Sequence, residues 1–125
     1  MMATENEKVV SDFCKTWSTL NIDKVMEFFT DDAVYHNIPL KPASGKAEIR
    51  KTIDGFMTGT TSVEFKILNS ASAGAVVFNE RVDSFVLNGK HLSLPVTGVF
   101  EISGGKIKAW RDYFDLSTYM NQIKG

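Results

Sequence analysis

The sequence contains only one cysteine, Cys14, among its 125 residues. A single cysteine excludes an intrachain disulfide and a cysteine-rich metal site, and apolar neighbours predict that Cys14 is a small residue of the core. No apolar run approaches the roughly 20 residues that cross a bilayer. The first seven residues lack the basic segment and apolar run of a secretory signal. We therefore expect a soluble protein of a reducing cytoplasm.

The sequence also lacks an excess of either charge. It has 14 lysines and arginines against 15 aspartates and glutamates, which gives a net charge of -1. No basic run or basic helix face stands out, so we expect neither a nucleic acid nor a membrane as a partner. The two histidines, His36 and His91, lie far apart and show no ligand spacing. We therefore expect no bound metal.

What the sequence does contain is enough apolar material for a core, since 43% of its residues are hydrophobic. Its length suits one domain, residues 1–125. Apolar residues at helical spacing predict helices over residues 5–20, 22–30 and 45–57, with a short closing helix over 115–123. Asn21 and Ser44 are the expected N-caps of the second and third helices.

Alternating apolar and polar residues predict strands in the rest of the chain. The expected strands cover residues 33–39, 63–67, 76–87, 91–101 and 107–114, and residues 40–44 are expected to form a loop. Asn88-Gly89 is a strong hairpin signal. Helices followed by a run of strands indicate an α+β fold, in which a bent sheet carries helices on one side.

One strand has an unusual face. Because alternate side chains of a strand point to opposite sides, Asn79, Arg81, Asp83 and Phe85 share a face. An exposed pair such as Arg81 and Asp83 contributes about 0 to 1 kcal/mol and means little. Burying two charges costs several kcal/mol per ion, so a buried pair requires a reason.

Three further polar residues stand beside apolar neighbours on other segments. Tyr35 and Asn37 share a face of one expected strand, and Asp112 lies on the last strand. Two carboxylates around one arginine are not equivalent, because repulsion and burial raise the pKa of one while the arginine keeps the other ionised. Such a site provides one general acid and one general base. A purely structural network of salt bridges remains the alternative at this point.

The order of three sequence blocks resembles the limonene-1,2-epoxide hydrolase family. The blocks are YHNIP at residues 35–39, NERVD at 79–83 and WRDYFD at 110–115. The resemblance implies a cone-shaped α+β fold of the nuclear-transport-factor-like superfamily, in which a strongly curved mixed sheet and N-terminal helices close a conical pocket. It also implies a homodimer without metal or organic cofactor that opens an epoxide with water in one step.

Carried onto this chain, the resemblance implies a catalytic role for five residues. Asp112 would be the general base, and Tyr35 and Asn37 would position the attacking water. Asp83 would be the acid that protonates the epoxide oxygen, and Arg81 would bridge the two aspartates. The substrate would be a small or medium apolar epoxide, terpene-like or cyclic, and the product a vicinal diol.

Other residues are assigned to the pocket wall or placed outside the site. The expected substrate-contacting wall consists of Phe85, Leu94, Val96 and Phe114, which share a face with the aspartates or should pair beside them. We expect Arg111 and Asp115 to form an exposed or interface ion pair. His36 is expected to take no part in catalysis.

Two other functions remain open on the sequence. A ketosteroid-isomerase-like or polyketide-cyclase-like enzyme of the same fold would use one carboxylate to abstract a proton next to a carbonyl. The bridging Arg81 argues against this, since that chemistry needs no link between two carboxylates. The third function is a non-catalytic module that binds a small molecule.

Overall fold

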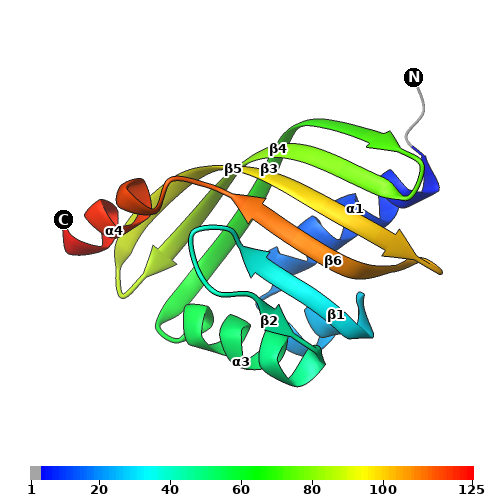
Figure 1. Ribbon diagram of the computed structural model, residues 1–125. Coiled ribbons are helices and arrows are strands. Elements are labelled where there is room, and N and C mark those ends of the chain that lie inside the picture. The colour runs from blue at the N-terminus through cyan, green and yellow to red at the C-terminus, as the bar shows by residue number, and fades with distance from the viewer. Residues whose placement is uncertain (1–3) are drawn as a thin grey trace.

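The computed structural model describes residues 4–125. Helix α1 (Glu5–Thr16), the 3-10 helix η1 (Trp17–Thr19) and helix α2 (Ile22–Met26) come first, followed by strands β1 (Phe29–Asn37) and β2 (Ala43–Ser44) and helix α3 (Lys46–Met57). Strands β3 (Thr60–Ala73), β4 (Val76–Leu87), β5 (Lys90–Ser103) and β6 (Lys106–Tyr113) follow, and helix α4 (Leu116–Lys124) comes last (Figure 1).

The strands form one six-stranded sheet in the order β2-β1-β6-β5-β4-β3. The β1–β6 pair is parallel and the other pairs are antiparallel, so the sheet is mixed. The sheet curls without closing, and α1 and α3 lie on one side of it (Figure 1), with α2 packed against both helices. The expected α+β fold with a strongly curved mixed sheet and N-terminal helices is confirmed.

Helix α1 begins at a side-chain cap and buries one face. Thr4 accepts a hydrogen bond from the backbone N–H of Glu7 at 3.1 Å, and this glutamate suits the positive end of the helix dipole. Val10, Phe13 and Cys14 are buried, which confirms the core position predicted for the cysteine. The helix expected over residues 5–20 is instead α1 plus one turn of η1, which ends where Leu20 adopts a left-handed conformation with φ of 60°.

The second expected helix is shorter than predicted. Asn21 caps α2 as expected, but the helix ends at Met26 and strand β1 begins at Phe29. Phe29 pairs with Ile107 of β6 and is buried. Pairing with β6, which is distant in the sequence, therefore ends the helix earlier than the apolar spacing of residues 22–30 predicts.

Two smaller expectations are also wrong. Part of the expected loop over residues 40–44 forms strand β2, in which Ala43 pairs with Tyr35 of β1. Ser44 does not cap α3, because Gly45, with φ of 85°, occupies the N-cap and no side chain bonds to the helix end. The expected β4 is confirmed from Val76 to Leu87, and Asn88 and Gly89 form its hairpin turn with positive φ.

Aromatic rings form the centre of the core below the site. Phe13 of α1 meets the Trp110 ring edge to face, with ring centres 4.9 Å apart. The Tyr35 ring stacks on Trp110, with ring centres 4.1 Å apart and an interplanar angle of 11°. Packing of β1, β6 and α1 therefore fixes the direction of the Tyr35 hydroxyl. No helix within residues 4–125 is long and apolar enough to span a membrane.

Candidate active site

Arg81 lies at the centre of the polar cluster and is only 1% exposed. Its Nε and Nη2 donate to the two carboxylate oxygens of Asp83, each at 2.9 Å. Its Nη1 and Nη2 donate to the carboxylate of Asp112, at 3.2 and 2.8 Å. A further Nη1 bond reaches Oδ1 of Asn79 at 3.0 Å. These bonds use all five N–H groups of the guanidinium.

The sheet register explains how one arginine reaches both aspartates. Asp83 stands two residues after Arg81 on the same face of β4. Asp112 belongs to β6, and β5 runs between β4 and β6. At that point β5 carries Gly98, which is paired with Asn79 on one side and with Asp112 on the other. A glycine leaves the face open, so the guanidinium crosses β5 without meeting a side chain.

Tyr35 and Asn37 approach the cluster from β1. In the parallel pairing of β1 with β6, Tyr35 lies opposite Trp110 and Asn37 lies opposite Asp112. The Tyr35 hydroxyl donates to Oδ1 of Asn37 at 3.1 Å. Asp112 also accepts a 2.7 Å bond from Nε1 of Trp110. The structure thus brings together the five residues that the sequence singled out.

Burial and charge set the protonation of the cluster. Burial raises the pKa of Asp83 to about 6, against the lowering effect of the hydrogen bonds and charge of Arg81, and the charge of Asp112 adds to the rise. Burial alone would lower the pKa of Arg81, but Asp112 and Asp83 outweigh it and raise the pKa well above its usual value. Asp83 can therefore gain or lose a proton close to neutral pH while the arginine stays charged.

Burial also raises the pKa of two other groups near the cluster. The pKa of Tyr35 lies well above its usual value because of burial and the nearby charge of Asp112, so its hydroxyl stays a neutral donor. Burial raises the pKa of the Cys14 thiol to about 12. Cys14 accepts a weak bond of 3.7 Å from the Asn79 amide. A neutral buried thiol is a poor nucleophile, so this cysteine is structural.

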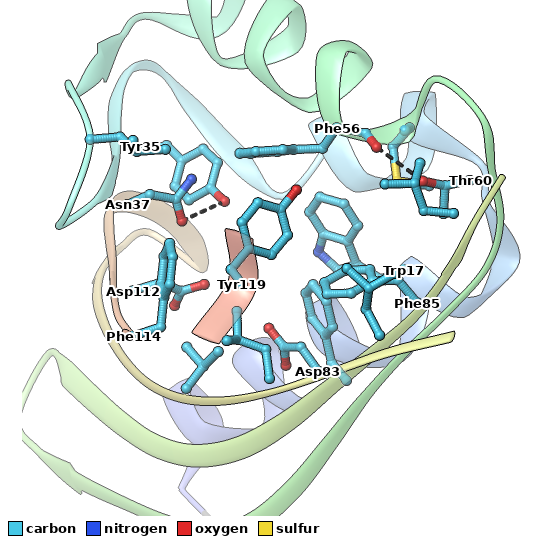
Figure 2. Close-up of a pocket in the computed structure, with 17 residues that line it drawn as sticks. Trp17, Tyr35, Asn37, Phe56, Thr60, Asp83, Phe85, Asp112, Phe114 and Tyr119 are labelled. Carbon is cyan, nitrogen blue, oxygen red and sulfur yellow. Dashed lines mark hydrogen bonds between the residues drawn. The ribbon is translucent and has the colours of Figure 1, made fainter. Parts of the chain in front are cut away.

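A pocket opens on this cluster and is lined by 17 residues. The carboxylates of Asp83 and Asp112 point into it, and Tyr35 and Asn37 stand beside Asp112 (Figure 2). All four expected wall residues line it: Phe85, Leu94, Val96 and Phe114. Arg81 does not line the pocket and lies behind the two carboxylates that do.

Sequence reasoning missed part of the wall. Leu92 lies on the same face of β5 as Leu94 and Val96, so alternation could have identified it. No sequence signal identified Tyr119, because α4 reaches the pocket through contacts of Gln122 with the backbone of Ser93 on β5. The other lining residues outside the expected wall are Trp17, Leu40, Phe56, Met57, Thr60, Phe65 and Leu87.

The residues expected outside the site do lie outside the pocket. Arg111 and Asp115 do not form the expected ion pair with each other. Arg111 instead donates to Glu101 at 2.6 Å, and Asp115 accepts from the backbone N–H of Thr118 at 3.0 Å and so caps α4. His36 contacts the backbone oxygen of Leu40. Among residues 4–125 there is no group of three or more potential metal ligands.

Comparison with known proteins connects this geometry to one family. Residues 4–124 match the model of the limonene-1,2-epoxide hydrolase catalytic domain. Epoxide hydrolase EphG of Mycobacterium tuberculosis is 33% identical over 107 residues, which is 86% of this chain and 71% of that protein.

Two solved structures share the fold. The structure of an M. tuberculosis epoxide hydrolase similar to limonene-1,2-epoxide hydrolase has 30% identity and a TM-score of 0.83, over 96% of this chain and 90% of that chain. A putative SnoaL-like polyketide cyclase from Shewanella putrefaciens has a TM-score of 0.87 over 98% of both chains, but only 13% identity, so it supports the fold alone. The chain therefore belongs to the limonene-1,2-epoxide hydrolase family and is, in its general class, an epoxide hydrolase.

Proposed function

We propose that this protein adds water to an epoxide in one concerted step and releases a vicinal diol. The observation that carries the proposal is the double bridge of Arg81 to two carboxylates that both line the pocket. A ring-opening reaction needs an acid for the leaving oxygen and a base for the attacking water, and this cluster offers both.

Asp112 takes the role of the base. It deprotonates a water molecule held by its own carboxylate together with Tyr35 and Asn37, which are paired beside it on β1. The water oxygen forms a bond to one epoxide carbon while the bond from that carbon to the epoxide oxygen breaks. Holding the water and the epoxide in line removes much of the entropic cost of bringing them together.

Asp83 takes the role of the acid. Its raised pKa keeps part of the population protonated near neutral pH, so it can give a proton to the epoxide oxygen as the ring opens. Each such proton transfer contributes about 10² to 10⁴ in rate. The step leaves Asp112 protonated and Asp83 ionised, and a proton must return from one to the other before the next turnover. Arg81 contacts both carboxylates, so it stabilises the negative charge on either side.

The substrate class follows from the wall of the pocket. Phe56, Phe85, Leu94, Val96 and Phe114 present apolar surface on several sides of the carboxylates. A small or medium epoxide with a largely apolar body, cyclic or terpene-like, fits such surroundings. The reaction proposed needs no metal and no organic cofactor. The family resemblance further supports a homodimer of this chain.

Isomerase or cyclase chemistry is the competing proposal for this fold. It needs one base and one donor for a developing oxyanion, and it gives no role to a second carboxylate bound to the same arginine. The bridge of Arg81 to Asp83 and Asp112 therefore favours hydrolysis.

The test is an assay of the wild-type protein with cyclohexene oxide, limonene oxide and related epoxides, with the diol quantified by chromatography. A β,γ-unsaturated ketosteroid, the precursor of a conjugated enone, serves as the substrate for the competing chemistry. Diol formation is expected, and a single turnover in water labelled with oxygen-18 should place the label directly in the diol. Absence of diol from every epoxide would contradict the proposal. Label that enters an aspartate first would contradict the one-step mechanism.

A further inference from the structure

Trp17 lines the pocket and carries a buried hydrogen-bond donor that has no partner. The residue begins η1, is 3% exposed and lines the pocket. Its indole Nε1 is buried and is the one such side-chain nitrogen or oxygen without a hydrogen-bond partner among residues 4–125. Buried donors in folded proteins nearly always have a partner, because an unpaired one loses its bond to water and gains nothing.

The other tryptophan provides a comparison within the same core. Trp110 lies 5.9 Å from Trp17 between ring centres, and its Nε1 donates to Asp112 at 2.7 Å. Trp17 packs against apolar rings, with Phe65 at 5.0 Å and Phe13 at 6.0 Å. Those contacts involve only the aromatic ring, and a phenylalanine at this position could make them too. Packing therefore gives no reason for an N–H group at this position.

The orientation of the indole suggests that the Trp17 N–H bonds to a molecule bound in the pocket. Figure 2 shows the nitrogen-bearing edge of Trp17 turned toward the side on which Tyr119 and Asp83 lie, and all three residues line the same pocket. Phe65, which packs against Trp17, also has the Arg81 guanidinium over its ring, with the guanidinium carbon 5.0 Å from the ring centre. A ligand that reaches the two carboxylates occupies the pocket that Trp17 also lines.

We propose that the Trp17 N–H binds the substrate, and that the substrate is an epoxide carrying a second, uncharged hydrogen-bond acceptor on its apolar body. An indole can only donate, so the matching group is a carbonyl, ester or ether oxygen. A site built around a donor discriminates strongly against the analogue that lacks the acceptor, because the N–H is then left unpaired. This inference rests on the proposed epoxide hydrolysis for its substrate class.

The first test is independent of turnover and uses the two indole N–H signals of ¹⁵N-labelled protein. Trp17→Phe assigns them, and Trp110, whose N–H is already bonded, is the internal control. The ligands are diols in matched pairs, such as 3-butoxypropane-1,2-diol and octane-1,2-diol, with ether or ester oxygens at successive chain positions. We expect a downfield shift of the Trp17 proton with at least one acceptor-bearing diol and not with its hydrocarbon partner. Equal shifts of the Trp17 proton with both diols of every pair would overturn the inference. That result is expected if water, and not the ligand, accepts the bond from Trp17.

The second test compares kcat/KM for the corresponding epoxide pairs. Trp17→Phe should lower the ratio of acceptor-bearing to hydrocarbon substrate about tenfold, a change typical of one lost hydrogen bond. Phe13→Leu is the matched control, because Phe13 packs against the Trp17 ring but does not line the pocket, and it should leave that ratio within about twofold. A wild-type enzyme that hydrolyses both members of every pair equally well would overturn the role of Trp17 and leave the proposed function intact.

A wild-type protein that hydrolyses no epoxide would refute the proposed function. The indole shifts would then still decide whether the Trp17 N–H binds an acceptor.

Discussion

A Cβ atom built on Gly98 would lie 2.5 Å from Nη1 of Arg81. The same atom would lie 2.8 Å from Oδ1 of Asn79. No Cβ tolerates such contacts, so the absent side chain of β5 is what allows Arg81 of β4 to reach Asp112 of β6. The charge bridge across three strands therefore depends on a residue that takes part in none of its hydrogen bonds.

Gly98→Ala should accordingly damage both stability and activity. Arg81 and Asn79 would have to move in a packed core, which typically costs about 1 to 3 kcal/mol. We expect a lower midpoint in urea unfolding and a drop in kcat on an epoxide that the wild type hydrolyses. Gly55→Ala is the matched control, since nothing lies within 4 Å of its would-be Cβ and it lies in helix α3, where alanine is favoured. Equal behaviour of the two variants would show that Gly98 has no such role.

Asp83→Asn and Asp112→Asn should each reduce kcat by at least about 100-fold, the lower range for loss of a general acid or base. Asparagine has nearly the same size, so the circular dichroism spectrum should stay that of the wild type. Diol formation from cyclohexene oxide is the measurement. Activity within about tenfold of wild type in either variant would contradict the assigned roles.

The raised pKa of Asp83 predicts how activity depends on pH. If Asp83 acts as an acid, only its protonated form is active, so kcat/KM should fall with rising pH above the folded-state pKa of about 6. The check is a kcat/KM profile from pH 5 to 9, with enzyme returned to pH 6 to confirm that it has not unfolded. A profile that rises through this range would mean that Asp83 works in its ionised form.

The same shift predicts a less common pH dependence of stability. The folded-state pKa of Asp83 lies above its unfolded value, so between about pH 4 and pH 6 the folded state holds a proton that the unfolded state has lost. The contribution of this group is present at the acid end and is lost as the pH rises through about 6. Urea unfolding of wild type and Asp83→Asn at pH 4.5 and pH 7 measures it. The destabilisation on going to pH 7 should be smaller in the variant, and an identical difference in both proteins would refute the prediction.

The sequence predicted the charge cluster well because strand alternation is strictly local. Arg81 and Asp83 stand two residues apart in β4, so they had to share a face. It could not show that Gly98 opens the way across β5, since that depends on the register of three strands. Pairing of Phe29 with Ile107 likewise overrode the helical spacing of residues 22–30.

The unpredicted features of the pocket have the same origin. Tyr119 reaches the pocket because Gln122 of α4 exchanges two hydrogen bonds with the backbone of Ser93, each 2.8 Å long. The lack of a partner for the Trp17 nitrogen depends on the positions of all the groups around the ring. Both features depend on tertiary packing that leaves no periodic trace in the sequence.

The complete use of the Arg81 donors also determines which ligands the pocket can accept. All five N–H groups face Asn79, Asp83 and Asp112, so the cation offers no hydrogen to a bound molecule. A molecule bound in the pocket contacts the carboxylates of Asp83 and Asp112 but not the Arg81 guanidinium that balances their charge. Free carboxylic acids should therefore be poor inhibitors, and neutral amides or protonated amines of the same shape should compete better for the pocket.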